Sequence, residues 1–169
     1  MKRLLCTILV LVSGFSSVFS LELSDFVFKL NFTQTLSLGE NLVDKRHFLS
    51  EEIKSDWINE DQDVPVKMVN HYFEGIGIQT SDDRIIDILV TSKKYPMLNG
   101  LRVGDSEEKI LKKFAGETPD LGNSDNTKTV YLYEKKLPKK DIWKQPEYLL
   151  LITVKNKVID KIEIAYMEE

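Results

Sequence analysis

The sequence predicts an α+β protein in which an antiparallel sheet of about five to seven strands is covered on one face by two short helices. Three observations support this fold class. Apolar and polar residues alternate along residues 26–38, which is the period-two pattern of a long half-buried strand that either continues or breaks near Gln34. Residues 76–90 and 148–166 each place two alternating strands on either side of a short polar turn, as β-hairpins do. Between them, residues 105–116 have the composition of a short amphipathic helix.

The N-terminus has the features of a secretory signal peptide. Lys2 and Arg3 precede an uncharged apolar run, and small or modest residues lead to Ser20. The run is shorter than the roughly 20 residues that span a bilayer, so an uncleaved membrane anchor is the weaker alternative. We therefore expect residues 1–20 to be removed and residues 21–169 to form a single exported domain, in a periplasm or outside the cell.

Removal of this segment changes the charge and the cysteine content of the chain. It leaves 149 residues with 21 basic and 27 acidic side chains, a net charge of −6, which argues against a general nucleic-acid-binding protein. The only cysteine, Cys6, lies within the removed segment. The mature chain is therefore expected to have no disulfide, no thiolate zinc site and no cysteine nucleophile, and to depend on its hydrophobic core.

Two segments are predicted to be short helices. A first helix is expected to begin at Ser50, because acidic residues follow it and because Ile53 and Trp57 are one helical turn apart. In the second, Asp105 is the expected N-cap, and Glu108 would complete a capping box.

The remaining segments predict loops and one further strand. Residues 117–128 are polar and predict a loop, whereas the alternation at 129–135 predicts a strand. Residues 59–63 have the first oxygen-bearing positions of a calcium loop, but Val64 stands where the required glycine would be. A solvated acidic loop is therefore the better interpretation of this stretch.

The chain contains two short internal sequence similarities. Residues 84–87 (RIID) match residues 157–160 (KVID) at an offset of 73, and residues 36–40 (LSLGE) resemble residues 101–105 (LRVGD) at an offset of 65. A duplicated unit would explain both matches. The alternative is that any two hairpins resemble one another, and the unequal offsets are compatible with that.

Residues 72–116 combine a hairpin, a Gly-apolar-x-apolar-Gly-Asp step and a short helix ending at glycine. In this respect the chain resembles the BamE/β-lactamase-inhibitor-protein-like repeat domains, with a looser second hairpin near the C-terminus. The resemblance implies an exported domain, with helices on an antiparallel sheet, that binds another protein as an envelope accessory or an enzyme inhibitor. It also allows two degenerate repeats, at about 21–92 and 93–169. The chain lacks the lipid-attachment cysteine of the accessories and the disulfides of the inhibitors, so no partner identity carries over.

No pattern in the sequence predicts catalysis or a cofactor. A nucleophile elbow, an HExxH motif, a phosphate-binding loop and a CxxC motif are all absent. The two histidines, His47 and His71, are far apart in the sequence, and a lone histidine is more often packed or exposed than catalytic. We therefore expect a protein that is not an enzyme and that binds neither a metal nor another cofactor.

The predicted binding surface is a basic segment in this acidic protein. It contains Lys136, Lys139, Lys140 and Trp143, and it lies between two predicted strands. Such a segment suits contact with an acidic protein, an anionic polymer or a membrane surface. The alternative is that the lysines keep a loop soluble while Trp143 packs on the core, which the usual burial of tryptophan favours.

These observations predict an exported, non-enzymatic domain that binds a protein partner in a bacterial cell envelope. It would not bind nucleic acid, and it would contact a membrane at most without spanning it. One alternative is a small envelope hydrolase that uses a pair of carboxylates, which requires two converging acids with a raised pKa. Another is a structural, membrane-proximal protein built on a long exposed strand at residues 26–38.

Overall fold

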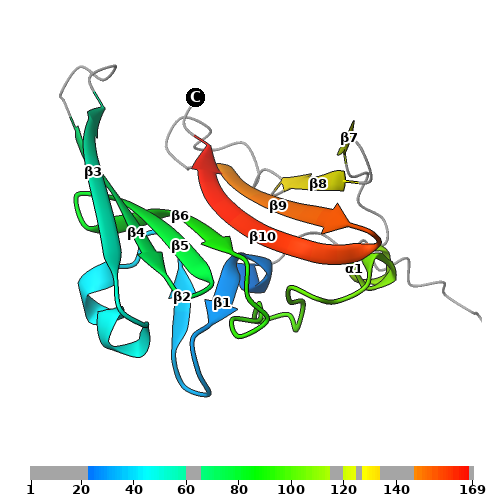
Figure 1. Ribbon diagram of the computed structural model, residues 1–169, viewed down its shortest axis with the longest axis horizontal. Coiled ribbons are helices and arrows are strands. Elements are labelled where there is room, and N and C mark those ends of the chain that lie inside the picture. The colour runs from blue at the N-terminus through cyan, green and yellow to red at the C-terminus, as the bar shows by residue number, and fades with distance from the viewer. Residues whose placement is uncertain (1–22, 60–65, 115–119, 125–126, 134–146, 168–169) are drawn as a thin grey trace, which may run out of the picture.

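The computed structural model describes residues 23–59, 66–114, 120–124, 127–133 and 147–167, and within these ranges the chain is predominantly β (Figure 1). Eight antiparallel strands form one sheet in the order β3-β4-β5-β6-β10-β9-β8-β7. Their bounds are β3 (Ile53–Asn59), β4 (Val66–Phe73), β5 (Ile76–Ser81), β6 (Arg84–Val90), β7 (Asp120–Ser124), β8 (Thr127–Tyr133), β9 (Glu147–Lys155) and β10 (Val158–Met167). The described ranges also contain a two-stranded sheet, β1 (Val27–Lys29) with β2 (Thr35–Ser37), one α-helix, α1 (Glu107–Lys113), and three 3-10 helices, η1 (Leu23–Phe26), η2 (Leu42–Asp44) and η3 (Arg46–Phe48).

The predicted antiparallel sheet is confirmed, but the predicted balance of helix and sheet is wrong. The large sheet has eight strands rather than five to seven, and the segment predicted as the first helix contains the strand β3. Ile53 and Trp57 misled the prediction because a spacing of four residues places two side chains on one side of a helix and equally on one side of a strand. The strand β7 likewise lies within a segment predicted as a loop, and β4 was not predicted.

The alternating segment at residues 26–38 breaks before Thr35, close to the position that the sequence allows, and forms a hairpin instead of one long strand. The Asn31 side chain accepts hydrogen bonds from the backbone N–H groups of Thr33 and Gln34, both at 2.9 Å, and this turn separates β1 from β2. Phe28 and Leu36, which are paired across the hairpin, are both fully buried. The segment is therefore not the single exposed strand that the structural, membrane-proximal alternative requires.

The helix α1 is present where the sequence predicts it, with a different cap. Ser106 is the N-cap residue, and its side chain makes no capping hydrogen bond. The Asp105 carboxylate instead accepts a hydrogen bond from the backbone N–H of Arg102 at 3.0 Å and one from Lys109 Nζ at 2.6 Å. Asp105 thus closes the turn that precedes the helix, and the predicted capping box is wrong.

One face of the large sheet carries the core. Alternate residues of β5, β6, β9 and β10 point to this face and are buried, among them Ile78, Ile88, Ile152 and Ile162. The hairpin β1–β2 and the helix α1, with Ile110 buried, lie against this same side of the sheet (Figure 1). The described elements therefore cover one face of the sheet and leave its opposite face open.

The two halves of the chain attach to the sheet through equivalent hydrogen bonds. Gly39 donates its backbone N–H to the carbonyl of Ile85 at 2.7 Å, and Gly104 donates to the carbonyl of Ile159 at 2.9 Å. In return, Ile85 donates to the carbonyl of Glu40 at 3.0 Å, and Ile159 donates to that of Asp105 at 2.8 Å. Both glycines have positive φ angles, +79° and +90°, which only glycine adopts without strain.

The turns of the two hairpins show the same equivalence. Asp82–Asp83 and Asn156–Lys157 have positive φ at both central residues, as in a type I′ turn, which matches the twist of paired strands. Their alignment gives an offset of 74, and the bulges that skip Ile86 in β6 and Asp160 in β10 have the same offset. The RIID and KVID matches, at an offset of 73, are therefore one residue out of register with the structural equivalence. The sheet consists of two four-stranded meanders, β3–β6 and β7–β10, joined where β6 pairs with β10. The descent of both from one unit stays a prediction.

Candidate binding surface

The residues predicted from sequence to form a binding surface, Lys136, Lys139, Lys140 and Trp143, lie outside the described residues. The same holds for the predicted signal peptide, residues 1–20. Both predictions therefore stay predictions. The described residues contain two other polar groupings on the large sheet, one on its open face and one buried beneath β4 and β5.

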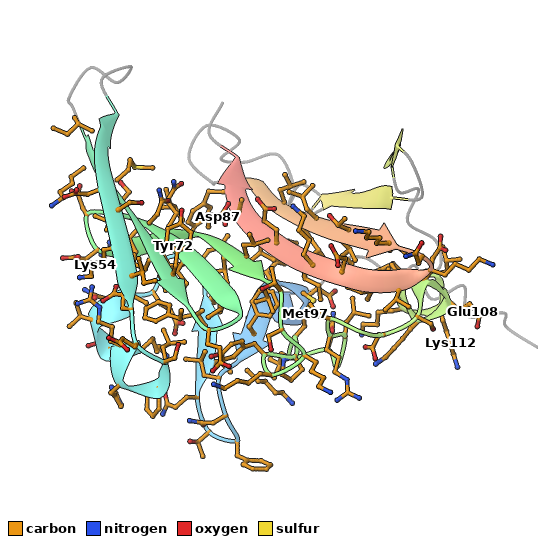
Figure 2. All side chains as sticks on the ribbon, in the orientation of Figure 1. Lys54, Tyr72, Asp87, Met97, Glu108 and Lys112 are labelled. Atoms are coloured by element: carbon orange, nitrogen blue, oxygen red, sulfur yellow. The ribbon has the colours of Figure 1, made fainter. Side chains whose placement is uncertain are left out.

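The open face of the sheet is built from residues that alternate with the core. Register places Asn70, Gln79 and Asp87 opposite one another across β4, β5 and β6. The neighbouring row contains Tyr72, Gly77 and Leu89, with Glu163 of β10 opposite Leu89. Figure 2 shows Tyr72 and Asp87 on the side of the sheet away from Met97 and α1. We call these residues, Asn70, Tyr72, Gln79, Asp87, Leu89 and Glu163, the open-face cluster.

The apolar part of the open-face cluster surrounds a residue without a side chain. A Cβ atom placed on Gly77 would lie 3.8 Å from Cδ1 of Tyr72 and 3.9 Å from Cβ of Leu89. Both neighbours therefore lie against the backbone of β5. Because Gly77 has no side chain, no side chain rises from β5 between Tyr72 and Leu89. Tyr72 remains half exposed there. An aromatic ring in this position offers apolar contact area and a hydroxyl group to a partner.

The polar part of the open-face cluster contains one amide pair and one carboxyl pair. Gln79 Nε2 donates a hydrogen bond to Asn70 Oδ1 at 2.9 Å. Asp87 and Glu163 are joined by a side-chain hydrogen bond between β6 and β10. Burial raises the pKa of Asp87 to about 7, with further contributions from the charge and hydrogen bond of Glu163, whereas Lys161 acts in the opposite direction. The Asp87 carboxyl group hence keeps its proton in a large fraction of molecules near neutral pH.

A second polar grouping surrounds His71, which the sequence did not single out for any role. His71 Nδ1 is hydrogen-bonded to the Glu52 carboxylate, and Nε2 lies 2.9 Å from the hydroxyl of Thr80. Arg46 and Lys54 also pair with Glu52, at 3.4 and 3.5 Å. The grouping links the segment before β3 to β4 and β5. We call it the His71 clasp.

The His71 clasp has the residue types of a catalytic triad but not the access. His71 is 2 % exposed and Thr80 is 1 % exposed, so no substrate in solution reaches the hydroxyl. Burial lowers the pKa of His71, although the hydrogen bond to Glu52 opposes this. Burial also acts to raise the pKa of Glu52, but the hydrogen bond to His71 and the nearby cations hold it below its ordinary value. The clasp therefore joins strands and offers no reactive group to a molecule in solution.

The alternation of β4 could have identified His71 as an inward residue. Position 71 is two residues before Phe73, which is buried, so both lie on the core face of the strand. His47, by contrast, is exposed on η3 and stacks against Phe48 with 3.7 Å between the ring centroids. The two histidines therefore do not meet in one site.

Two general properties concern the described part of the chain. Its histidine, aspartate and glutamate side chains form no group of three or more arranged to hold a metal ion. No helix within it has the length and apolar character needed to cross a membrane. Comparisons with protein-family models, curated proteins and solved structures find no match to this chain.

Proposed function

We propose that the protein is an exported, non-enzymatic binding domain that recognises a protein partner through the open-face cluster. The observation that carries this proposal is the one-sided covering of the sheet: among the described elements, β1, β2 and α1 pack on one face and leave the other to solvent (Figure 1). A partly apolar, partly hydrogen-bonding surface on rigid strands suits recognition of another protein.

The composition of the cluster indicates what the partner must supply. The Asn70 and Gln79 amides offer donors and acceptors, and Tyr72 offers an exposed aromatic ring. Asp87 and Glu163 are two acids that are costly to ionise together. A lysine or arginine of the partner placed beside them would relieve that repulsion, so we expect a basic side chain at the centre of the contact.

A site-specific photo-cross-linker tests the proposal. Position 72 on the open face is replaced by p-benzoylphenylalanine, and position 111 serves as the control, because Leu111 is 58 % exposed on α1, which packs on the covered side. Irradiation of cells that export the protein should give a discrete protein adduct from position 72 and none from position 111. The absence of an adduct at position 72, or the same adduct at both positions, would contradict the proposal.

A small hydrolase is the second candidate, and the Asp87–Glu163 pair is the observation that favours it. A carboxyl group with a raised pKa beside a second carboxyl group is an arrangement that can supply general acid catalysis. The variant Asp87→Asn distinguishes the candidates. A hydrolase would lose its turnover in this variant. A binding domain would show no turnover in either form, and the variant should weaken the cross-link from position 72, because it removes one of the acids that the partner's basic side chain contacts.

Export itself is part of the proposal and has its own measurement. The mass of the protein recovered from the cell envelope or the medium should equal that of a chain beginning at Leu21. Recovery of the full-length chain from the cytoplasm would contradict export but would leave the cross-linking result standing.

A further inference from the structure

The strand β3 lies at one end of the large sheet, with β4 as its only neighbour among the described strands. Ile53 is 72 % exposed, Ile58 is 61 % exposed, and the three residues Lys54, Ser55 and Asp56 are exposed as well. A free edge of seven residues presents backbone N–H and C=O groups to a further strand. The side chains along β3 decide which strand can pair with this edge.

We propose that two copies of this chain pair through β3, antiparallel and centred on Ser55, so that their sheets become continuous. This register places Lys54 of each copy opposite Asp56 of the other, which forms two cross-strand ion pairs related by the twofold axis. It also places Ile53 of each copy opposite Trp57 of the other. The edge strand is thus complementary to itself in charge.

The neighbouring symmetric registers are less favourable. Centring on Lys54 opposes two lysines, and it also sets Glu52 against Asp56. Centring on Asp56 opposes two aspartates directly. Centring on Trp57 or Ile58 leaves Lys54 without an acid from the other copy in β3. Among these registers, the one centred on Ser55 alone pairs opposite charges within β3, which argues for a specific dimer rather than for general edge-to-edge association.

The charged side chains are accessible for such pairing. Asp56 lies 3.1 Å from Lys67 and Lys54 lies 3.5 Å from Glu52, and the lysine and the aspartate that would pair across the dimer are 46 % and 64 % exposed. The Asp56–Lys67 pair is exposed on both sides, and pairs of this kind are weak and exchange readily. Glu52 is largely buried but keeps Arg46 and His71 as partners when Lys54 turns to a second strand.

The geometry of the dimer goes beyond the proposed function. A twofold axis between antiparallel edge strands is perpendicular to the sheet, so both copies present their open faces on the same side. The dimer would carry two recognition surfaces that face one way, which favours a repetitive or dimeric partner through effective concentration. Pairing through β3 does not depend on what the open face binds.

Charge reversal in the exported protein, residues 21–169, tests the register. Sedimentation equilibrium should show a monomer–dimer equilibrium. Lys54→Glu places a glutamate opposite Asp56 at both symmetry-related positions and should raise the dissociation constant about ten-fold or more. Asp56→Lys should act alike, and the double variant K54E/D56K should return to within about three-fold of the original value, because opposite charges again face each other. Lys112→Glu on α1, with the same change in net charge, should leave the constant within about two-fold.

A cysteine pair tests the centre of symmetry directly. Antiparallel neighbours have Cα atoms about 4.5–5.5 Å apart, within disulfide range, so Ser55→Cys should form a disulfide-linked dimer on mild oxidation. Ile58→Cys, on the same strand, would be about 20 Å from its symmetry mate and should not. A monomer at about 100 µM, a dimer insensitive to both charge reversals, a double variant as weak as the single ones, or cross-linking at position 58 and not at 55 would each overturn the proposal.

Discussion

The carboxyl groups of Asp87 and Glu163 are hydrogen-bonded to each other across the seam where β6 of the first meander pairs with β10 of the second. Each lies on the open face, half buried among neighbouring strand residues. An acid pair at this place ties the stability of the seam to pH, because ionising both groups brings two negative charges together.

The first prediction concerns the pH dependence that this pair causes. The folded pKa of Asp87, about 7, lies above its ordinary value of 3.8, so its stabilising contribution is fully present below pH 3.8 and is lost as the pH rises through about 7. Asp87→Asn removes that loss. We expect the variant to be more stable than the original protein at pH 8, by on the order of 1–3 kcal/mol, with a smaller difference at pH 5.

Urea unfolding at the two pH values measures this difference. Asp160→Asn is the matched control, since Asp160 is an exposed residue of the same strand as Glu163. It should change the free energy of unfolding by less than about 0.5 kcal/mol at either pH. A stability gain for Asp87→Asn that is the same at pH 5 and pH 8 would show that the acid pair does not titrate in this range.

The second prediction concerns the His71 clasp and has the opposite sign. The folded pKa of His71 is lowered from 6.5, so its contribution is present above pH 6.5 and is lost as the pH falls through the lowered folded value. NMR titration should therefore place the pKa of His71 below 6.5. A value above 6.5 would mean that the charge of Glu52 outweighs burial.

The third prediction concerns removal of the same side chain. His71→Ala leaves the buried Thr80 hydroxyl and the Glu52 carboxylate without their shared partner, and should cost about 3 kcal/mol of unfolding free energy at pH 7.5. His47→Ala, at an exposed position, should cost less than about 0.5 kcal/mol. Chemical denaturation of both variants measures the contrast, and equal costs would argue against the clasp.

The fourth prediction uses the equivalent glycines Gly39 and Gly104. Substitution by alanine strains the backbone at both, by about 1–2 kcal/mol, because both φ angles are positive. At Gly39 the added Cβ would also lie 2.8 Å from the Tyr166 hydroxyl, whereas at Gly104 no heavy atom lies within 4 Å. Thermal unfolding should therefore show Gly39→Ala to be the less stable variant, and the reverse order would contradict the close approach of Tyr166.

The fifth prediction concerns Tyr95. Its side chain is fully buried, and its hydroxyl has no hydrogen-bond partner within the described part of the chain. Tyr95→Phe removes an unsatisfied polar atom and keeps the ring, so it should raise the free energy of unfolding by about 1 kcal/mol. A destabilised variant, measured by urea unfolding, would show that the hydroxyl makes a bond in the folded protein.

The sequence was sufficient to predict those strands and helices whose pattern of apolar, polar and turn residues lies within a short stretch of the chain. The hairpins β5–β6 and β9–β10 were predicted because alternation and turn residues agree, and α1 was predicted from its amphipathic spacing. The end strands β3 and β7 were missed because strands with one neighbour tolerate charged and polar residues, which blurs their alternation.

The candidate site could not be predicted from the sequence, for a different reason. Asp87 and Glu163 meet only because β6 and β10 pair in one register, which no local pattern specifies. The His71 clasp likewise needs Glu52, His71 and Thr80 to come from three segments. Carboxylates are numerous in this chain, so the pair that matters could not be chosen before the strands were placed.

The seam between the meanders also has a consequence for how the chain acquires its structure. Every hairpin within a meander closes between neighbours in the sequence, but β6 and β10 join residues more than seventy positions apart. Contacts of long sequence separation form slowly, because the intervening loop must lose its freedom first. Each meander can therefore form early, while the seam sets the rate at which the molecule reaches its final state.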